Sequence, residues 1–180
     1  MSSYEKNDFY SDFSQIILKI NPQLIVEFGI LDGYSLDAFV DCRNEVCEIH
    51  AYDLFDDFPF NAADFSTIQK IYGHFKNIKI EKLDFYKGVD RYKDESIDIL
   101  HVDIANNGDV YKFAIENYMK KIKKGGVMLL EGGSKERDEV EWMNKFSKRK
   151  INPYIESIKD NFDISIIEKF PSVTIIKNKS

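Results

Sequence analysis

Acidic side chains recur where strand-like stretches of the sequence end. Glu27 lies near the end of an apolar run, and further acids close or directly follow later runs: Asp53, Asp84, Asp103 and Glu131. Carboxylates accept hydrogen bonds from ammonium and hydroxyl groups, and they are preferred ligands of Mg²⁺. The carboxyl ends of parallel strands form the ligand-binding edge of an open α/β sheet. The spacing therefore predicts a site at that edge for a cationic, hydroxyl-bearing ligand or for a divalent cation.

The segments that carry these acids alternate between helical and strand-like periodicity. Five such units and a terminal pair of strand runs predict an α/β fold: a doubly wound, mostly parallel seven-stranded sheet with helices on both faces and a C-terminal antiparallel hairpin. The expected helices cover about 9–20, 34–43, 62–75, 111–122 and 136–148, with a further segment near 155, and the expected strands cover 24–28, 47–53, 78–83, 96–103, 127–131, 163–168 and 173–177.

Two short connections refine this expectation. Residues 169–172 are too few to hold a crossover helix, so the last two strands must run antiparallel. Gly125 and Gly126 are expected to end the fourth long helix, and the lysines at 120, 121, 123 and 124 to complement its C-terminal dipole.

Length and composition exclude several classes of protein. The chain has 180 residues and a net charge of −6, which argues against nucleic acid or an anionic membrane as partner. Its two cysteines, and the lack of a signal peptide or an apolar membrane span, favour a cytoplasmic protein. We expect a single domain over 1–180, made of an N-terminal helix (1–21), a ligand-binding core (22–133) and a terminal helix and hairpin (134–180).

The loop after the first strand, in the sequence VEFGILDGYS (26–35), carries the sharpest local signal. A dinucleotide fingerprint has a central glycine that lets the backbone approach a pyrophosphate, but Ile30 and Leu31 stand there. Glu27 would also repel a pyrophosphate. A cationic ligand without phosphate fits better, and S-adenosylmethionine has that character; Asp53 could then accept hydrogen bonds from its ribose. The alternative is that the glycines only form a turn and that Glu27 is a half-exposed strand-end acid.

These motifs resemble those of a known family. VEFGILDGYS and AYDLF (51–55) resemble the first two motifs of class I S-adenosylmethionine-dependent methyltransferases, and IDILHVD (97–103) and KKGGVMLLEGG (123–133) resemble the motifs of the fourth and fifth strands. The Gly-Tyr-Ser ending is similar to the small O-methyltransferases of the catechol type, and YDLFDDFP (52–59) to the sugar O-methyltransferases of macrolide biosynthesis. The resemblance covers residues 24–133.

The resemblance assigns a role to each matching position on the cofactor side. It implies that Glu27, Gly29 and Gly33 line the methionine part of the cofactor, and that Tyr34 and Ser35 lie at the helix N-terminus that holds its carboxylate. It also implies that Asp53 binds the ribose and that Leu54, Asp84 and Phe85 surround the adenine. For Asp84 the alternative is a capping residue after the third strand.

On the acceptor side, the resemblance places Asp103 over the transferred methyl group. Asp103 could act as the base, or it could bind Mg²⁺ together with Glu131, or both acids could be unmetallated. Relatives often carry a His or Lys where this chain has Asn106, so we assign Asn106 a catalytic role in orienting the acceptor. The alternative is that Asn106 or Asn107 caps the next helix. His101 is expected to be a hydrogen-bonded core residue.

The function that the resemblance implies is S-adenosylmethionine-dependent O-methylation of a small hydroxylated acceptor such as a sugar. Because no separate cap domain is evident, a homodimer could complete the acceptor site. An alternative is a non-catalytic S-adenosylmethionine-binding module of a larger assembly, supported by the Asn at 106. A nucleotide-dependent oxidoreductase is disfavoured by the missing central glycine.

Overall fold

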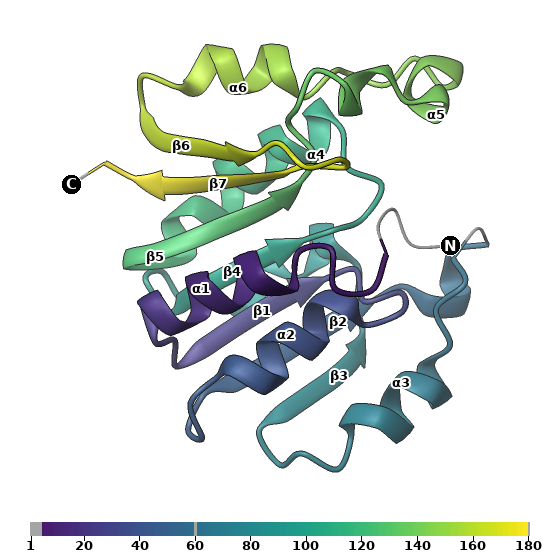
Figure 1. Ribbon diagram of the computed structural model, residues 1–180, viewed down its shortest axis with the longest axis vertical. Helices are drawn as coiled ribbons and strands as arrows, with labels where there is room; N and C mark the ends of the chain where they lie inside the picture. The colour runs from purple at the N-terminus through teal and green to yellow at the C-terminus, as the bar shows by residue number, and fades with distance from the viewer. Residues whose placement is uncertain (1–4, 60, 180) are drawn as a thin grey trace.

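In the computed structural model, which describes residues 5–59 and 61–179, seven strands form one sheet in the order β3-β2-β1-β4-β5-β7-β6. The strands are β1 (Leu24–Phe28), β2 (Glu48–Asp53), β3 (Ile78–Lys82), β4 (Ile97–Val102), β5 (Ile122–Glu131), β6 (Phe162–Ile167) and β7 (Val173–Asn178). Strands β1 to β5 are parallel, and β7 runs antiparallel between β5 and β6 (Figure 1). The predicted fold class and terminal hairpin are confirmed.

Helices cover both faces of this sheet (Figure 1). The helices α1 (Tyr10–Ile20), α2 (Tyr34–Cys42) and α3 (Phe65–Tyr72) lie on one face, and α4 (Gly108–Phe113) and α6 (Asn152–Ile158) lie on the other, with the short α5 (Glu141–Lys145) near α6. Within the described residues 5–59 and 61–179, none of these helices has the length and apolar character needed to cross a membrane.

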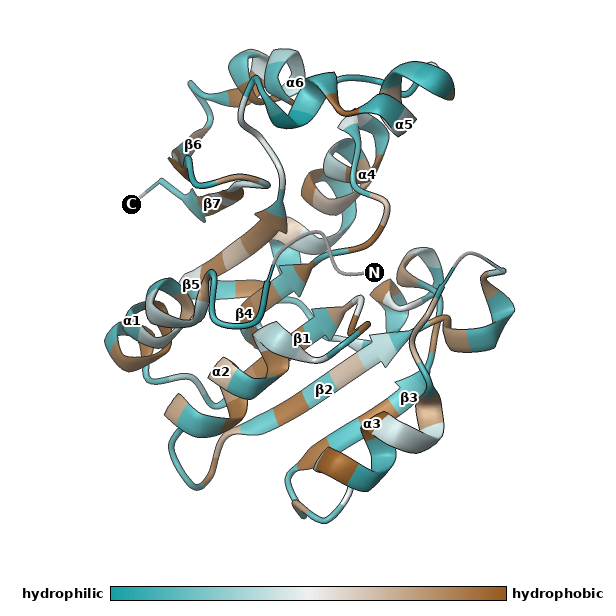
Figure 2. Cartoon of the chain, turned by 45° about the vertical axis from the view of Figure 1, so that its right-hand side comes forward, coloured by the Kyte–Doolittle hydropathy of each residue, from teal (hydrophilic) through white to brown (hydrophobic). Residues whose placement is uncertain are grey.

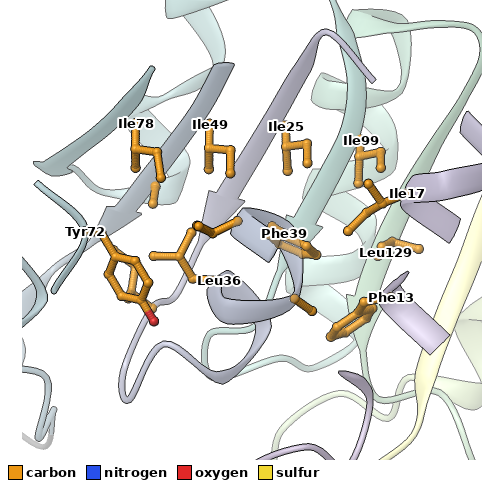
Figure 3. Close-up of a cluster of buried hydrophobic side chains, with 14 of the residues drawn as sticks. Phe13, Ile17, Ile25, Leu36, Phe39, Ile49, Tyr72, Ile78, Ile99 and Leu129 are labelled. Carbon is orange, nitrogen blue, oxygen red and sulfur yellow. The ribbon is translucent and has the colours of Figure 1, made fainter. Parts of the chain in front are cut away.

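The core under α1, α2 and α3 follows from the two-residue period of the strands. Alternate strand residues share one face, so the four isoleucines Ile25, Ile49, Ile78 and Ile99 form a row across neighbouring strands (Figure 3). Buried side chains of the three helices face this row: Phe13, Ile17, Leu36, Phe39 and Tyr72. This packing holds α1, α2 and α3 on this face of the sheet.

The opposite face is rich in aromatic residues. The β3–β4 connection consists of two 3-10 turns, 85–87 and 89–91, rather than a long helix. Phe85 in the first turn stacks on Tyr118 with ring centroids 5.1 Å apart and packs edge-on against Phe28 at 5.3 Å. Figure 2 shows the hydrophobic residues along β5 and the alternation of hydrophobic and hydrophilic residues along β2.

Two expected helices differ from the structure. The predicted helix at 136–148 is reduced to a turn at 137–139 and α5, because buried side chains of this segment fasten it to β5 and α6. The fourth helix ends at residue 121, and β5 already begins at Ile122. Gly125 and Gly126 therefore lie within β5, next to the register shift in its pairing with β4. Of the four lysines, only Lys120 and Lys121 lie at the end of the helix.

Candidate functional site

The loops that follow β1 and β4 touch each other at the carboxyl edge of the sheet. Gly29 has a φ of +93°, and a Cβ placed on it would lie 1.8 Å from the carbonyl oxygen of Asp103. Gly33 has a φ of +78° and is the N-cap residue of α2, so this helix begins without a capping side chain. Both glycines are thus required by backbone geometry, and the uncapped N-terminus of α2 can receive an anionic group.

Glu27 is fully buried beneath this loop. Its Oε1 accepts hydrogen bonds from Ser35 Oγ at 2.5 Å and from His101 Nδ1 at 2.9 Å. Its Oε2 is buried and has no hydrogen-bond partner among residues 5–59 and 61–179. The alternative of a half-exposed strand-end acid is therefore wrong. A buried carboxylate oxygen without a donor is costly, and a ligand ammonium group would satisfy it.

His101 lies in the core, as predicted, with its ring edge-on to Phe13 at 5.1 Å and to Phe39 at 5.4 Å. Its hydrogen bond to Glu27 was not predicted. The two residues are direct partners in the parallel register of β1 and β4, which a sequence pattern shows only once the strand order is known. His101 and Ser35 together fix which oxygen of Glu27 stays unpartnered.

The carboxylate of Asp53 is held by the neighbouring loops. Oδ2 accepts from the backbone N–H groups of Ile30 at 2.7 Å and Leu31 at 3.2 Å. Oδ1 accepts from the N–H of Phe55 at 2.9 Å and from the side-chain amide of Asn61. Three of these donors belong to the backbone, so the Asn61 amide is the donor that a ligand hydroxyl could most readily replace. Asn61 was missed by the sequence reasoning, since no spacing rule links it to Asp53.

The remaining predicted cofactor residues differ in their exposure. Tyr34 and Leu54 are half-buried, at the start of α2 and directly after Asp53. Asp84 caps the turn after β3, where its Oδ1 accepts from the N–H of Tyr86 at 2.9 Å, as the capping alternative predicts. Phe85 is buried in the aromatic core.

Asp103 and Glu131 end neighbouring strands, because Val102 of β4 pairs with Leu130 of β5. The Glu131 carboxyl group is buried and accepts two hydrogen bonds from one guanidinium, from Nε of Arg137 at 2.6 Å and from Nη2 at 3.0 Å. Burial, reinforced by the negative charge of Asp103, raises the pKa of Glu131 to about 8 against the opposing effect of Arg137. No motif or spacing in the sequence links Arg137 to Glu131.

This raised pKa predicts a pH-dependent stability. Folding raises the pKa of Glu131 above the value of 4.5 that applies to the unfolded chain, so the pH window that matters begins near 4.5 and extends upward through the raised pKa. We expect this group to lower the free energy of unfolding as the pH rises through that window, with a limiting slope of about 1.4 kcal/mol per pH unit. Glu131→Gln cannot titrate, so its urea-unfolding free energy should depend less on pH. Parallel curves for the two proteins would contradict the assignment.

The two asparagines after β4 have different roles. Asn107 caps α4 and accepts from the N–H of Asp109 at 2.9 Å, which agrees with the capping alternative. Asn106 is fully buried, and its amide donates to the carbonyl oxygens of Val102 at 2.8 Å and Glu131 at 2.9 Å. Its donors thus tie the ends of β4 and β5 together.

The strand order and the reversed β7 give the fold that solved methyltransferase structures share. A family model described as a methyltransferase domain matches residues 26–131. The chain therefore belongs to the methyltransferase domain family. A search of curated protein sequences finds no match.

Solved structures of methyltransferases share this fold. The SAH-bound methyltransferase PaMTH1 of Podospora anserina superposes with a TM-score of 0.74 at 16% identity, covering 99% of this chain and 81% of that chain. A methyltransferase from Geobacter sulfurreducens gives 0.71 at 16% identity, with coverage of 99% and 81%. The O-methyltransferase of Bacillus cereus in complex with SAH gives 0.71 at 13% identity, with coverage of 99% and 84%.

Proposed function

We propose that this chain transfers the methyl group of S-adenosylmethionine to a hydroxyl group of a small acceptor, such as a sugar. The observation that carries the proposal is the buried, unpartnered Oε2 of Glu27 beside the uncapped N-terminus of α2. An oxygen that needs a cationic donor and a helix end that accepts an anion suit the ammonium and carboxylate groups of an amino acid. The SAH bound to two of the similar structures carries the same ammonium and carboxylate groups as S-adenosylmethionine, which supports this interpretation.

The other residues around the loop would hold the rest of the cofactor. Asp53 would accept from the ribose once the Asn61 amide moves aside, and Leu54 would pack against the adenine. Tyr34 and Ser35, in the first turn of α2, would lie next to the carboxylate. Asp84 and Phe85 border the adenine side, where Phe85 supports the site from the core.

Methyl transfer from a sulfonium is an in-line displacement, so the protein mainly aligns the donor and the acceptor. Asp103 is half-buried at the end of β4 and would take the proton of the acceptor hydroxyl. Asn106 would act indirectly, because its amide donors already hold β4 and β5 together.

Ligand binding measured by calorimetry tests this proposal. We expect S-adenosylmethionine and S-adenosylhomocysteine to bind and NAD not to bind. Glu27→Gln should weaken binding roughly 10–100-fold, because it removes a charge-assisted hydrogen bond and places an amide N–H group toward the ammonium. Asp53→Asn should weaken binding to a similar degree.

The exposed Glu45→Gln is a matched control that should leave the affinity unchanged. Absence of binding by both sulfur ligands would contradict the proposed function. Wild-type affinity in Glu27→Gln would refute the assigned ammonium site instead.

One observation favours a second candidate, a module that binds S-adenosylmethionine without catalysis. Asn106 cannot take up a proton near neutral pH, and its amide is engaged in the fold. Such a module would bind both sulfur ligands but would methylate no acceptor, so cofactor binding without any transfer would favour it.

A further inference from the structure

Asp103 and Glu131 form an acid pair at adjacent strand ends. Val102, the last residue of β4, pairs with Leu130 of β5, so Asp103 follows β4 directly beside the carboxyl end of β5, where Glu131 is the last residue. Two acids at neighbouring strand ends favour a nearby cation, and Mg²⁺ is one expectation for this position.

The structure already places a cation there. The guanidinium of Arg137 donates to both oxygens of Glu131, at 2.6 and 3.0 Å, and both side chains are buried, with exposures of 5% and 1%. Nη1 of Arg137 donates to Sδ of Met143 at 3.2 Å, and Trp142 stacks over the guanidinium at 5.3 Å. Mg²⁺ requires several oxygen ligands in near-octahedral geometry, and both Glu131 oxygens are engaged. This donor set does not fit a divalent metal.

The same guanidinium fastens the segment 134–150 to the edge of the sheet. The backbone N–H of Arg137 donates to Ser134 Oγ at 3.1 Å. The adjacent Asp138 accepts from the N–H groups of Ile151 at 2.6 Å and Asn152 at 2.8 Å, where α6 begins. Hydrogen bonds of its side chain, of its backbone and of the adjacent Asp138 therefore fix the position of Arg137 at the site.

We propose that the guanidinium of Arg137 is the resident cation of the Asp103–Glu131 pair, and that the acceptor site works without a divalent metal. Arg137 is then a positioning residue: it balances the charge of the pair and fixes the Glu131 carboxyl group. The inference deepens the proposed function and rests on it only for what the site does with an acceptor. The identity of the cation can be tested on the protein alone.

The test is a titration with Mn²⁺, a probe for Mg²⁺ sites, in which electron paramagnetic resonance measures the bound metal. We expect the wild-type protein to have no Mn²⁺ site that includes Asp103. The titration curves of wild type and Asp103→Asn should therefore be equal. Arg137→Met, similar in length but neutral, should gain one Mn²⁺ site whose affinity is at least about tenfold above the background binding of wild type, because the pair loses its cation. This site should vanish in Arg137→Met combined with Asp103→Asn.

Two further variants separate charge from packing. Arg137→Lys keeps the positive charge without the planar fork and should still exclude Mn²⁺. Arg149→Met removes an exposed arginine, 3.7 Å from Asp109, and should gain no site. Loss of a packing contact alone would not make Arg137→Lys and Arg137→Met differ in metal binding.

Two results would overturn the proposal. One is a single Mn²⁺ bound by wild type and lost in Asp103→Asn, a measurement that needs no variant of Arg137. The other is a folded Arg137→Met, verified by circular dichroism, that binds no Mn²⁺. Neither result depends on S-adenosylmethionine, whose failure to bind would contradict the proposed function instead.

Discussion

Gly29→Ala is expected to lower the free energy of unfolding by at least about 3 kcal/mol, or to prevent folding. The added Cβ would lie 1.8 Å from the carbonyl oxygen of Asp103, closer than any non-bonded contact allows. That oxygen belongs to the backbone, so it cannot rotate away as a side chain would. The positive φ of +93° adds a conformational penalty of about 1–2 kcal/mol. Urea unfolding followed by circular dichroism measures the loss.

Gly125→Ala is the matched control for this variant. Gly125 also has a positive φ, +84°, but a Cβ there meets no atom of the described part of the chain within 4 Å. It should therefore show only the conformational penalty of about 1–2 kcal/mol. Equal losses in the two variants would mean that the loops after β1 and β4 are not in tight contact in solution.

Asp103→Asn is expected to reduce methyl transfer roughly 10²–10⁴-fold while S-adenosylmethionine still binds with nearly its wild-type affinity. The amide has almost the shape of the carboxyl group but cannot take the proton of the acceptor hydroxyl. The measurement is transfer of a labelled methyl group, first in a screen of small hydroxylated acceptors with wild type and then with the variant on whichever acceptor reacts.

Asp109→Asn, on the exposed first turn of α4, is the control for a general effect of the substitution and should keep full activity. An Asp103→Asn protein with full turnover would show that Asp103 is not the base. A combined loss of binding and turnover would assign Asp103 to the cofactor site.

The strand ends and the antiparallel hairpin could be predicted because they depend on local rules. A strand that is buried on both faces appears in the sequence as a short apolar run, and a connection of four residues is too short to hold a crossover helix. The positions of Glu27, Asp53, Asp103 and Glu131 at one edge follow from those rules alone.

The partners of these acids could not be predicted in the same way. Arg137 reaches Glu131 from a segment whose helical pattern gave way to tertiary contacts, and Asn61 reaches Asp53 from an irregular loop. His101 meets Glu27 across 74 positions of the sequence, through the pairing of β1 with β4. Such contacts depend on the three-dimensional path of the chain and leave no periodic trace.

The position of β1 between β2 and β4 also has a consequence for how the chain folds as it is synthesised. Strand β1 can pair with β2 soon after both have emerged, but its other neighbour, β4, is made much later. Until then one edge of β1 stays open, and the carboxyl group of Glu27 faces solvent or a chaperone rather than His101. Contacts of such long sequence separation slow folding. Strand β1, although it is made first, thus gains both of its neighbours only after four of the seven strands have been made.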